Sequence, residues 1–396
     1  MKHKKVVLGV TGGIAIYKAL EVISLLKKLE IEVQVIMTRH AREFVTPMTF
    51  EAMSGRKVLT DLFTLGADSK IEHIEVAKTA DLFVVLPATA NIIGKMARGI
   101  ADDLLSTTLL ATKAPVYVAP AMNTNMFEHV SVQENLGILR DRGVVIIEPD
   151  AGRLACGDTG KGKLAPPEDI VEQIVWALEA RQTLKDKKIL VTAGPTVEPI
   201  DPVRYITNPS SGRMGFEMAR AARALGAEVY LVAGPVNLKT PFGVRRIDVT
   251  TSEDMYREVM GLYDRMDIVI KAAAVLDYRP EKVHEKKIKK EDIEASLTLE
   301  RTRDILKTLG KTKSHQFLVG FAAQTHDVVD YAKAKIRDKN LDFMVANDVS
   351  LKGGGFQSEW NEVYLITRDM QVTHLSLDKK SVIAKEILEK IADMVK

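Results

Sequence analysis

The feature that most restricts the fold of this chain is a repeated alternation of short apolar runs and longer segments with helical spacing. The first run, KKVVLGVTGG, is rich in β-branched residues and ends in two glycines. Ile16, Leu20, Ile23 and Leu26 follow at helical spacing. Later runs are EVQVIMT, DLFVVLPA, APVYVAPA and VVIIEP. Because stretches long enough for helices separate them, the pattern predicts the parallel strands of a doubly wound α/β sheet.

The same alternation begins again after a charged segment, residues 177–187, which lacks an apolar face and is interpreted as a linker. The second series is KKILVTAGPT, AEVYLVAGP, MDIVIKAAAV, FLVGFAAQT, DFMVAND and EVYLIT. The sequence therefore predicts two Rossmann-like α/β domains, residues 1–180 and 187–396.

Charge and cysteine usage exclude several classes of protein. With 56 basic and 53 acidic residues the net charge is +3, so nothing favours nucleic acid or a membrane as the main partner. No signal-like start and no apolar run near the roughly 20 residues of a membrane span is present. The single cysteine excludes an intramolecular disulfide framework and a cysteine-based structural metal site. We expect an intracellular, cytoplasmic protein.

Ligands of open α/β sheets bind beyond the carboxyl ends of the strands, so the residues after each predicted strand are candidates for a site. In the first half, Gly12 and Gly13 would let the backbone approach a phosphate at a helix N-terminus. The pair is not GxGxxG, and it equally fits a tight turn without a ligand. A histidine such as His73 could transfer protons or simply pack. Cys156, in RLACGDTGKG, is either a functional thiol or a residue tolerated in a surface turn.

Four segments between residues 12 and 165 resemble a known family: GGIAIYK, PATANIIGKMARGIADDLLSTTLLA, PAMNTNM and ACGDTGKGKLA. They are similar to the flavin-dependent cysteine decarboxylases, in particular the phosphopantothenoylcysteine decarboxylase half of a bifunctional family of coenzyme A biosynthesis. The resemblance implies a flavodoxin-like domain that binds FMN. The FMN contacts that it implies are Gly12, Gly13, Thr38, Thr89, Ser106 and Thr107.

The resemblance also implies a reaction. In the family, flavin oxidises the cysteinyl group to a thioaldehyde, carbon dioxide is lost, and the resulting enethiol is reduced. His73 would be the base in the oxidation, and Asn123 would bind the amide and carboxylate of the substrate. Cys156 would give the proton of the reductive step, on a glycine-flanked loop that acts as a mobile lid.

Two segments of the second half suit phosphate binding. Ser210, Ser211 and Gly212 precede a predicted helix, where backbone amides suit phosphate oxygens, although the serines also fit simple N-caps. The run KKIKK follows a buried strand and could reach a triphosphate, or it could be a solvated basic loop. No Walker loop is present, which argues against a P-loop nucleotidase.

The motifs GPTVEPIDPVRYITNPSSGRMG, AAAVLDYR, KIKK, VGFAAQT and ANDVS resemble the phosphopantothenate–cysteine ligase domain of the same family. There, the carboxylate of 4′-phosphopantothenate attacks CTP with Mg²⁺ to give an acyl-cytidylate, and the amine of L-cysteine displaces CMP. Asn208 would contact the acyl phosphate, and Lys287 would stabilise the transition state. Where relatives have Asn-Pro-Asp-Ile, this chain has Arg303-Asp304-Ile305, whose backbone could still read the base. The implied CTP contacts are Ala273, Asp277, Lys287, Asp304, Ile305, Phe321, Lys335 and Lys339, and no metal ligands are indicated.

The leading hypothesis is therefore ligation followed by decarboxylation, which converts 4′-phosphopantothenate and L-cysteine to 4′-phosphopantetheine. A nicotinamide or flavin oxidoreductase is the rival enzyme, and a nicotinamide requirement would favour it. A flavin-holding regulatory subunit is the non-enzymatic rival, and turnover would exclude it. The resemblance further implies a homo-oligomer, with trimeric contacts in the first half and dimeric contacts in the second.

Overall fold

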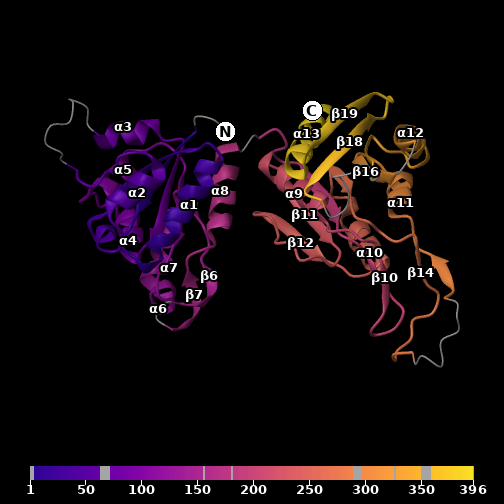
Figure 1. Ribbon diagram of the computed structural model, residues 1–396, viewed down its shortest axis with the longest axis horizontal. Helices are drawn as coiled ribbons and strands as arrows, with labels where there is room; N and C mark the ends of the chain where they lie inside the picture. The colour runs from indigo at the N-terminus through magenta and orange to yellow at the C-terminus, as the bar shows by residue number, and fades with distance from the viewer. Residues whose placement is uncertain are drawn as a thin grey trace. The chain divides into compact units, whose positions relative to one another are not determined.

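The computed structural model describes residues 4–62, 72–154, 157–179, 182–288, 297–324, 327–348 and 358–395. The chain divides into two compact units, unit 1 from Met1 to Glu179 and unit 2 from Ala180 to Lys396 (Figure 1). Each unit has its own sheet covered by helices, which confirms the predicted α/β class. In the ranges given above, no helix combines the length and the apolar character needed to span a bilayer.

Unit 1 contains a five-stranded parallel sheet in the order β2-β1-β3-β4-β5. Its strands are β1 (Lys5–Val10), β2 (Glu32–Met37), β3 (Leu82–Ala88), β4 (Val116–Pro120) and β5 (Val145–Ile146). Because β2 lies on one side of β1 and all later strands lie on the other, the strand order reverses between β1 and β3. This is the flavodoxin-like order, and such a reversal opens a crevice at the carboxyl ends of the two strands.

Helices cover both faces of this sheet, because each helix places an apolar stripe against it. One face is covered by α1 (Tyr17–Lys28), α2 (Pro47–Ser54) and α8 (Pro167–Glu179). The other is covered by α3 (Glu72–Thr79), α4 (Ala90–Arg98), α5 (Leu104–Ala111) and α7 (Val130–Asp141). Shorter elements at the carboxyl edge are η1 (Ile14–Ile16), η2 (Arg39–Glu43), α6 (Thr124–Glu128), β6 (Asp150–Arg153) and β7 (Thr159–Lys163).

Unit 2 contains an eight-stranded sheet in the order β12-β11-β8-β13-β16-β17-β18-β19. The six parallel strands are β8 (Lys188–Ala193), β11 (Glu228–Ala233), β12 (Val244–Asp248), β13 (Ile268–Lys271), β16 (Phe317–Gln324) and β17 (Phe343–Asp348). The last two, β18 (Trp360–Thr367) and β19 (Val372–Lys379), are antiparallel. The order of the parallel strands is that of a Rossmann fold, and it reverses between β8 and β13.

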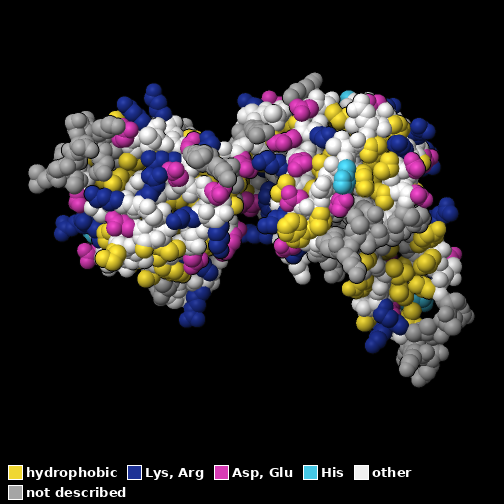
Figure 2. Space-filling view, turned by 45° about the horizontal axis from the view of Figure 1, so that its top comes forward, with side chains coloured by type: hydrophobic (Ala, Val, Ile, Leu, Met, Phe, Trp, Pro, Cys, Tyr) yellow, Lys and Arg dark blue, Asp and Glu magenta, His cyan; other side chains and the backbone are white. Residues whose placement is uncertain are grey.

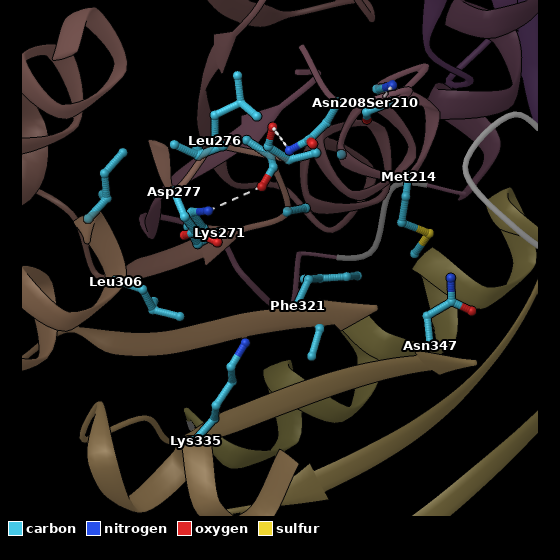
Figure 3. Close-up of a pocket in the computed structure, with 18 of the residues that line it drawn as sticks. Asn208, Ser210, Met214, Lys271, Leu276, Asp277, Leu306, Phe321, Lys335 and Asn347 are labelled. Carbon is cyan, nitrogen blue, oxygen red and sulfur yellow. Dashed lines mark hydrogen bonds between the residues drawn. The ribbon is translucent and has the colours of Figure 1, made fainter. Parts of the chain in front are cut away.

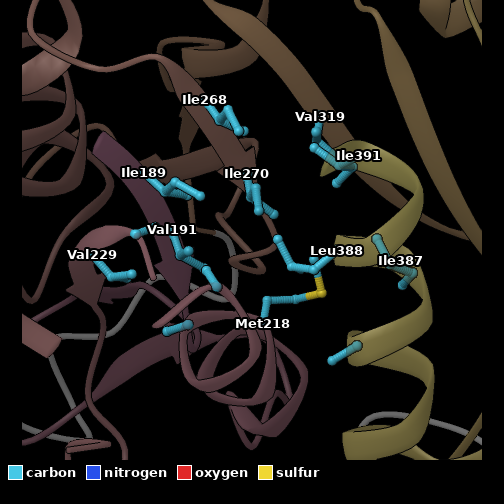
Figure 4. Packing of buried hydrophobic residues seen from close by; sticks show 14 of the residues in the cluster. Ile189, Val191, Met218, Val229, Ile268, Ile270, Val319, Ile387, Leu388 and Ile391 are labelled. Carbon is cyan, nitrogen blue, oxygen red and sulfur yellow. The ribbon is translucent and has the colours of Figure 1, made fainter. Parts of the chain in front are cut away.

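The helices of unit 2 also form two layers. α9 (Arg213–Ala224) and α13 (Lys380–Met394) pack on one face, where Met218 and Leu388 meet Val191 and Ile270 of the sheet (Figure 4). α10 (Ser252–Tyr263), α11 (Ile305–Thr312) and α12 (Val328–Asp338) pack on the other. Leu184, inside the predicted linker, is fully buried in the first of these cores, and α8 continues to Glu179. The boundary between the units falls inside the predicted linker, but the linker is shorter than predicted, because α8 extends into its start and Leu184 anchors the chain before β8 begins.

Candidate functional site

The crevice between β1 and β3 in unit 1 brings together predicted residues from two strand ends. The Thr11 hydroxyl donates a hydrogen bond to the carbonyl of Pro87 (2.6 Å), and the Thr89 amide donates to the Thr11 oxygen (3.3 Å). A methyl group added at Gly13 would lie 3.6 Å from Cγ2 of Thr89. Gly13 and Thr89, 76 positions apart in the sequence, therefore lie next to each other beyond the carboxyl ends of β1 and β3.

Gly12 and Thr38 lie just beyond the carboxyl ends of β1 and β2. The Thr38 amide donates to the carbonyl of Val10 (3.0 Å), so the end of β2 lies against the end of β1. A Cβ atom at Gly12 would lie only 2.6 Å from Cβ of His40 and 2.8 Å from its carbonyl carbon. Glycine is required there because the backbone of η2 approaches so closely.

Ser106 and Thr107, predicted to contact FMN, lie in the first turn of α5. The Ser106 amide and hydroxyl both donate to Oδ1 of Asp103 (2.8 Å each), and the Thr107 hydroxyl donates to the Asp103 carbonyl (2.8 Å). These bonds cap α5, and Ser106 is almost fully buried. In this structure the two hydroxyls stabilise a helix start, and their predicted contact with FMN stays a prediction.

Asn123 contacts Asp158, which lies two positions after the single cysteine in the sequence. Its Nδ2 donates to Oδ2 of Asp158 (2.7 Å), and the Leu154 amide donates to the Asp158 carbonyl (2.8 Å). Cys156 lies outside the described residues. The segments before and after it form an antiparallel hairpin, β6 and β7, where the sequence analysis expected only a loop. The hydrogen bond from Asn123 links the PAMN segment to the ACGD segment across the sequence.

His73 lies in the first turn of α3 and is half-buried. Residues 63–71, which precede this helix, are outside the described residues. The helix packs against α5 and leads directly into β3. The predicted role of His73 as a base stays a prediction.

Unit 2 has a cavity of about 370 Å³ at the carboxyl ends of β13 and β16, beside the start of α9 (Figure 3). Its wall combines the start of α9, the residues after β13, the start of α11, strand β16 and helix α12. The Asn208 amide group donates to the carbonyl of Ala274 (3.2 Å), which ties the loop before α9 to the exit of β13. The predicted residues in this wall are Asn208, Ala273, Asp277, Asp304, Ile305, Phe321, Lys335 and Lys339.

Charged groups dominate one side of the cavity. Burial lowers the pKa of Lys271 to about 8, with Lys339 acting in the same direction, and its ammonium donates to the Ala273 carbonyl (3.2 Å). Lys339 pairs with Asp304 (2.7 Å). Burial acts to raise the pKa of Asp304, but the hydrogen bonds from Lys339 and the Lys307 amide, together with the charges of Lys339 and Lys271, hold this pKa below the usual range. Cations and carboxylates placed this way suit a polyphosphate ligand.

Lys287 does not line the cavity in this structure; it is exposed. The residue after it is anchored, since the Ile288 amide donates to Asp201 (3.3 Å) and Arg204 donates to the Ile288 carbonyl (2.9 Å). Burial acts to raise the pKa of Asp201, but hydrogen bonds from Arg204 and nearby amides hold it well below the usual range. Asp201 therefore stays ionised and fixes the start of the lysine run against the loop between β9 (Val197–Pro199) and β10 (Tyr205–Thr207).

The cavity wall also contains residues that sequence reasoning did not single out: Lys271, Arg213, Asn347, Asn361 and Lys380. Lys271 had a signal, because it is a charged residue at the end of the apolar run MDIVIK. Arg213 and Asn347 lie inside the quoted motifs, in SSGRMG and ANDVS. Asn361 and Lys380 had no signal, because their place depends on where β18 and β19 join the sheet. Among the residues that the structure describes, no group of three or more His, Cys, Asp or Glu could hold a metal ion.

Comparison with known proteins matches both units. A family model described as Flavoprotein matches residues 1–179, and one described as DNA/pantothenate metabolism flavoprotein C-terminal domain matches residues 184–395. The coenzyme A biosynthesis bifunctional protein CoaBC of Bacillus subtilis (strain 168) is 48% identical over 100% of this chain and 98% of its own length. That of Escherichia coli (strain K12) is 44% identical over 98% of this chain and 96% of its own.

A crystal structure of the C-terminal domain of a CoaBC protein is 45% identical and covers 54% of this chain and 98% of its own, with a TM-score of 0.47. The full-length relatives match both units in the same order and over nearly their whole length. The chain therefore belongs to the family of coenzyme A biosynthesis bifunctional proteins, CoaBC, and is an enzyme with decarboxylase and ligase activities.

Proposed function

We propose that unit 2 joins 4′-phosphopantothenate to L-cysteine with consumption of CTP, and that unit 1 converts the product to 4′-phosphopantetheine with FMN. The observation that supports this most is the cavity of unit 2. It gathers side chains from β13, α11, β16 and α12 that the sequence predicted as contacts of one nucleotide.

In the ligase reaction, CTP lies across this cavity with its phosphates near the start of α9 and near Lys335 and Lys339. The carboxylate of Asp304 is already occupied, by the Lys339 ammonium and by the Lys307 amide (2.9 Å). Backbone groups at Asp304 and Ile305 are therefore left to read the cytosine. Ala273, Asp277 and Phe321 complete the nucleotide site, and Mg²⁺ accompanies the triphosphate.

Two residues act on the acyl group. Asn208 is held by the Ala274 carbonyl at the mouth of the cavity, where it can contact the acyl phosphate. Lys287 stabilises the charge of the transition state by reaching the cavity from its anchor at Ile288. In the structure Lys287 is exposed, so this role requires the lysine segment to move toward the nucleotide.

The residues at the β1/β3 crevice fit FMN. Glycine backbone and neutral hydroxyl groups converge there, and such donors suit a phosphate ester at the start of a helix. Gly12 and Gly13 would hold the phosphate, with Thr38, Thr89, Ser106 and Thr107 as further contacts. When bound, FMN supplies the two-electron oxidation and the later return of electrons.

Three side chains of unit 1 handle the substrate. His73 takes up a proton during oxidation, Asn123 binds the amide and carboxylate, and Cys156 donates a proton in the reductive step. The hydrogen bond between Asn123 and Asp158 supports this grouping, because Asp158 is only two positions from Cys156 in the sequence. A thiol that donates protons must stay reduced, which supports a cytoplasmic location.

We also propose that the chain acts as a homo-oligomer, with trimeric contacts through unit 1 and dimeric contacts through unit 2. Both units expose large apolar side chains, which commonly mark protein interfaces. Figure 2 shows hydrophobic side chains gathered on unit 2 around β14 (Tyr278–Pro280). The exposed apolar residues in this region are Val203, Tyr205, Tyr278, Val283 and Leu299, and those near the unit 1 crevice are Ile14, Tyr17, Phe44 and Met48.

The test mixes purified protein with FMN, Mg²⁺, CTP, L-cysteine and 4′-phosphopantothenate, and follows the products by mass spectrometry. We expect CMP, pyrophosphate, carbon dioxide and 4′-phosphopantetheine. Parallel reactions with ATP in place of CTP, with EDTA, or with added nicotinamide nucleotide test each cofactor. Equal rates with ATP would refute the choice of CTP, and no product without a nicotinamide would revive the rival oxidoreductase.

A further inference from the structure

Asp158 is a residue of unit 1 to which the mechanism above gives no role of its own. It lies just before β7 and accepts a hydrogen bond from Nδ2 of Asn123 (2.7 Å), although the two residues are 35 positions apart in the sequence. Asn123 is half-buried and Asp158 is exposed. Groups at the edge of a site that must admit a substrate have this degree of access to solvent.

The two ends of the Asn123 amide have partners of opposite kind. Its Oδ1 accepts from the Asn125 amide at the start of α6 (2.9 Å), and its Nδ2 donates to the carboxylate of Asp158. A backbone N–H can only donate, and a carboxylate can only accept. Both partners therefore require the same orientation of the amide, because the flipped amide would place donor against donor and acceptor against acceptor.

The backbone around Asn123 packs closely against β7 (Figure 1). The Met122 amide donates to the Gly162 carbonyl (2.9 Å), and a Cβ atom at Gly162 would lie 2.4 Å from the Met122 carbonyl oxygen. A Cβ atom at Gly160 would lie 2.7 Å from Cγ2 of Thr124. The residues on both sides of Asn123 are thus held against one strand, and two glycines permit the close approach.

The backbone of Asp158 is held at the end of the same strand. The Leu154 amide donates to the Asp158 carbonyl (2.8 Å), and the pairing of β6 with β7 extends to Arg153 and Thr159. The carboxylate therefore meets the Asn123 amide from a fixed position. A charge-assisted hydrogen bond between two anchored backbones favours one geometry strongly, because little further freedom is lost when it forms.

We propose that Asp158 is a positioning residue of the decarboxylase, whose carboxylate keeps the Asn123 amide in the orientation that binds the amide and carboxylate of the substrate. The inference rests on the proposed function, which gives Asn123 its role, and extends it to a second residue. Asp158 acts through Asn123 and not on the reacting atoms. When the carboxylate is lost, fewer molecules hold the amide in this orientation, and the apparent affinity for the substrate falls with that fraction.

The test measures KM and kcat for decarboxylation of supplied phosphopantothenoylcysteine by the full chain with FMN. Asp158→Ala removes the acceptor, and we expect it to raise KM by about ten- to a hundredfold, as for loss of a charge-assisted hydrogen bond. Asp158→Asn keeps the side-chain shape and one acceptor oxygen, so its KM should rise less, by about two- to tenfold. In both variants kcat should stay within about threefold of wild type, because the reacting groups are unchanged.

The matched control is Asp150→Ala, which removes an exposed carboxylate from the start of β6, at the other end of the same hairpin. It should leave both constants unchanged. Flavin absorbance of the purified variants and the rate of ligation by unit 2 should equal those of wild type, which shows that both units are folded.

A double-mutant cycle separates positioning from a direct contact with the substrate. In the Asn123→Ala background, Asp158→Ala should raise KM no further, because the side chain that it positions is gone. Multiplied effects of the two substitutions, a wild-type KM in both Asp158 variants, or loss of FMN from Asp158→Asn would overturn the positioning role. A wild-type KM in Asn123→Ala alone would instead refute the role that the proposed function gives to Asn123.

Discussion

The two crevices of this protein arise from the same architecture but present different chemistry. In unit 1 the reversal of strand order lies between β1 and β3, and the groups that meet there are glycine backbone and the hydroxyls of Thr11 and Thr89. In unit 2 the reversal lies between β8 and β13, and Lys271, Lys339 and Asp304 line the cavity at the carboxyl ends of β13 and β16. The sheet thus provides the place for a ligand, and the residues just after the strands decide which ligand fits.

This difference predicts different sensitivities for the two reactions. Neutral hydrogen bonds change little with salt and pH, whereas ion pairs with phosphates weaken when salt screens them or when a lysine loses its proton. Ligation should therefore respond to both conditions more strongly than binding of FMN does. Variants and conditions that affect one unit should therefore leave the reaction of the other unit unchanged.

The largest effect is expected for Cys156→Ser. The weaker acid should slow the reductive step of unit 1 by about 10²- to 10⁴-fold, while ligation by unit 2 continues. Mass spectrometry should then show a product lighter than 4′-phosphopantetheine by two hydrogens. Formation of the normal product at the wild-type rate would remove Cys156 from the mechanism.

Lys287→Gln is the matching change in unit 2. Loss of a cation that stabilises the transition state should lower ligation by about 10²- to 10³-fold, or arrest it at the acyl-cytidylate. Decarboxylation of supplied phosphopantothenoylcysteine should stay at the wild-type rate, which serves as the control. Undiminished ligation would show that the lysine segment does not reach the nucleotide.

Nucleotide binding should weaken as the pH rises through about 8. Lys271 and Lys380 have pKa values lowered to about 8, so each is protonated below this pH and neutral above it. A bound triphosphate favours the protonated amines, so binding above this pH must take up protons. Calorimetry in buffers of different ionisation enthalpy measures that uptake.

Lys271→Met should remove part of this proton uptake. The charges of Lys335, Lys339, Asp277 and Asp304 also act on the pKa of Lys271. FMN binding by unit 1, followed by flavin fluorescence over the same pH range, provides the comparison. Equal pH dependence in the two units would contradict the contrast between a neutral and a charged crevice.

The smallest effect is expected for Thr89→Val. Removing one neutral hydroxyl at the β1/β3 crevice should weaken FMN binding by about three- to tenfold, as for one ordinary hydrogen bond. Thr79→Val, at an exposed threonine at the end of α3 beside Lys5 at the start of β1, is the control. Retention of FMN at wild-type affinity in Thr89→Val would indicate that the flavin does not contact this strand end.

Much of the fold could be predicted, because apolar runs and helical spacing are local signals. The predicted family is confirmed, and so is the doubly wound α/β class. The hairpin on both sides of residues 155–156 was not predicted, because TGKGK has the composition of a loop, and its pairing with DAGR depends on a contact across the turn. Leu184 was missed because one apolar residue in a charged segment has no period.

Of the candidate site, too, some parts could be predicted from the sequence and others could not. Asn208, Ala273, Asp277 and Phe321 were predicted from motifs next to strand ends, and the structure brings them to one cavity. Ser106 was predicted as a ligand contact, but its hydroxyl caps α5, a use that depends on the position of Asp103 relative to the helix start.

The sequence alone determined the alternation of strands and helices, the two-unit organisation and the motifs that place the chain in its family, because all of these depend on neighbours along the chain. Only the tertiary structure decided that Lys380 and Asn361, at the ends of an antiparallel strand pair, share a cavity with Lys271. Strand order in a sheet is set by packing between distant segments. Burial and charge at the ends of those strands follow from that order and leave no local mark in the sequence.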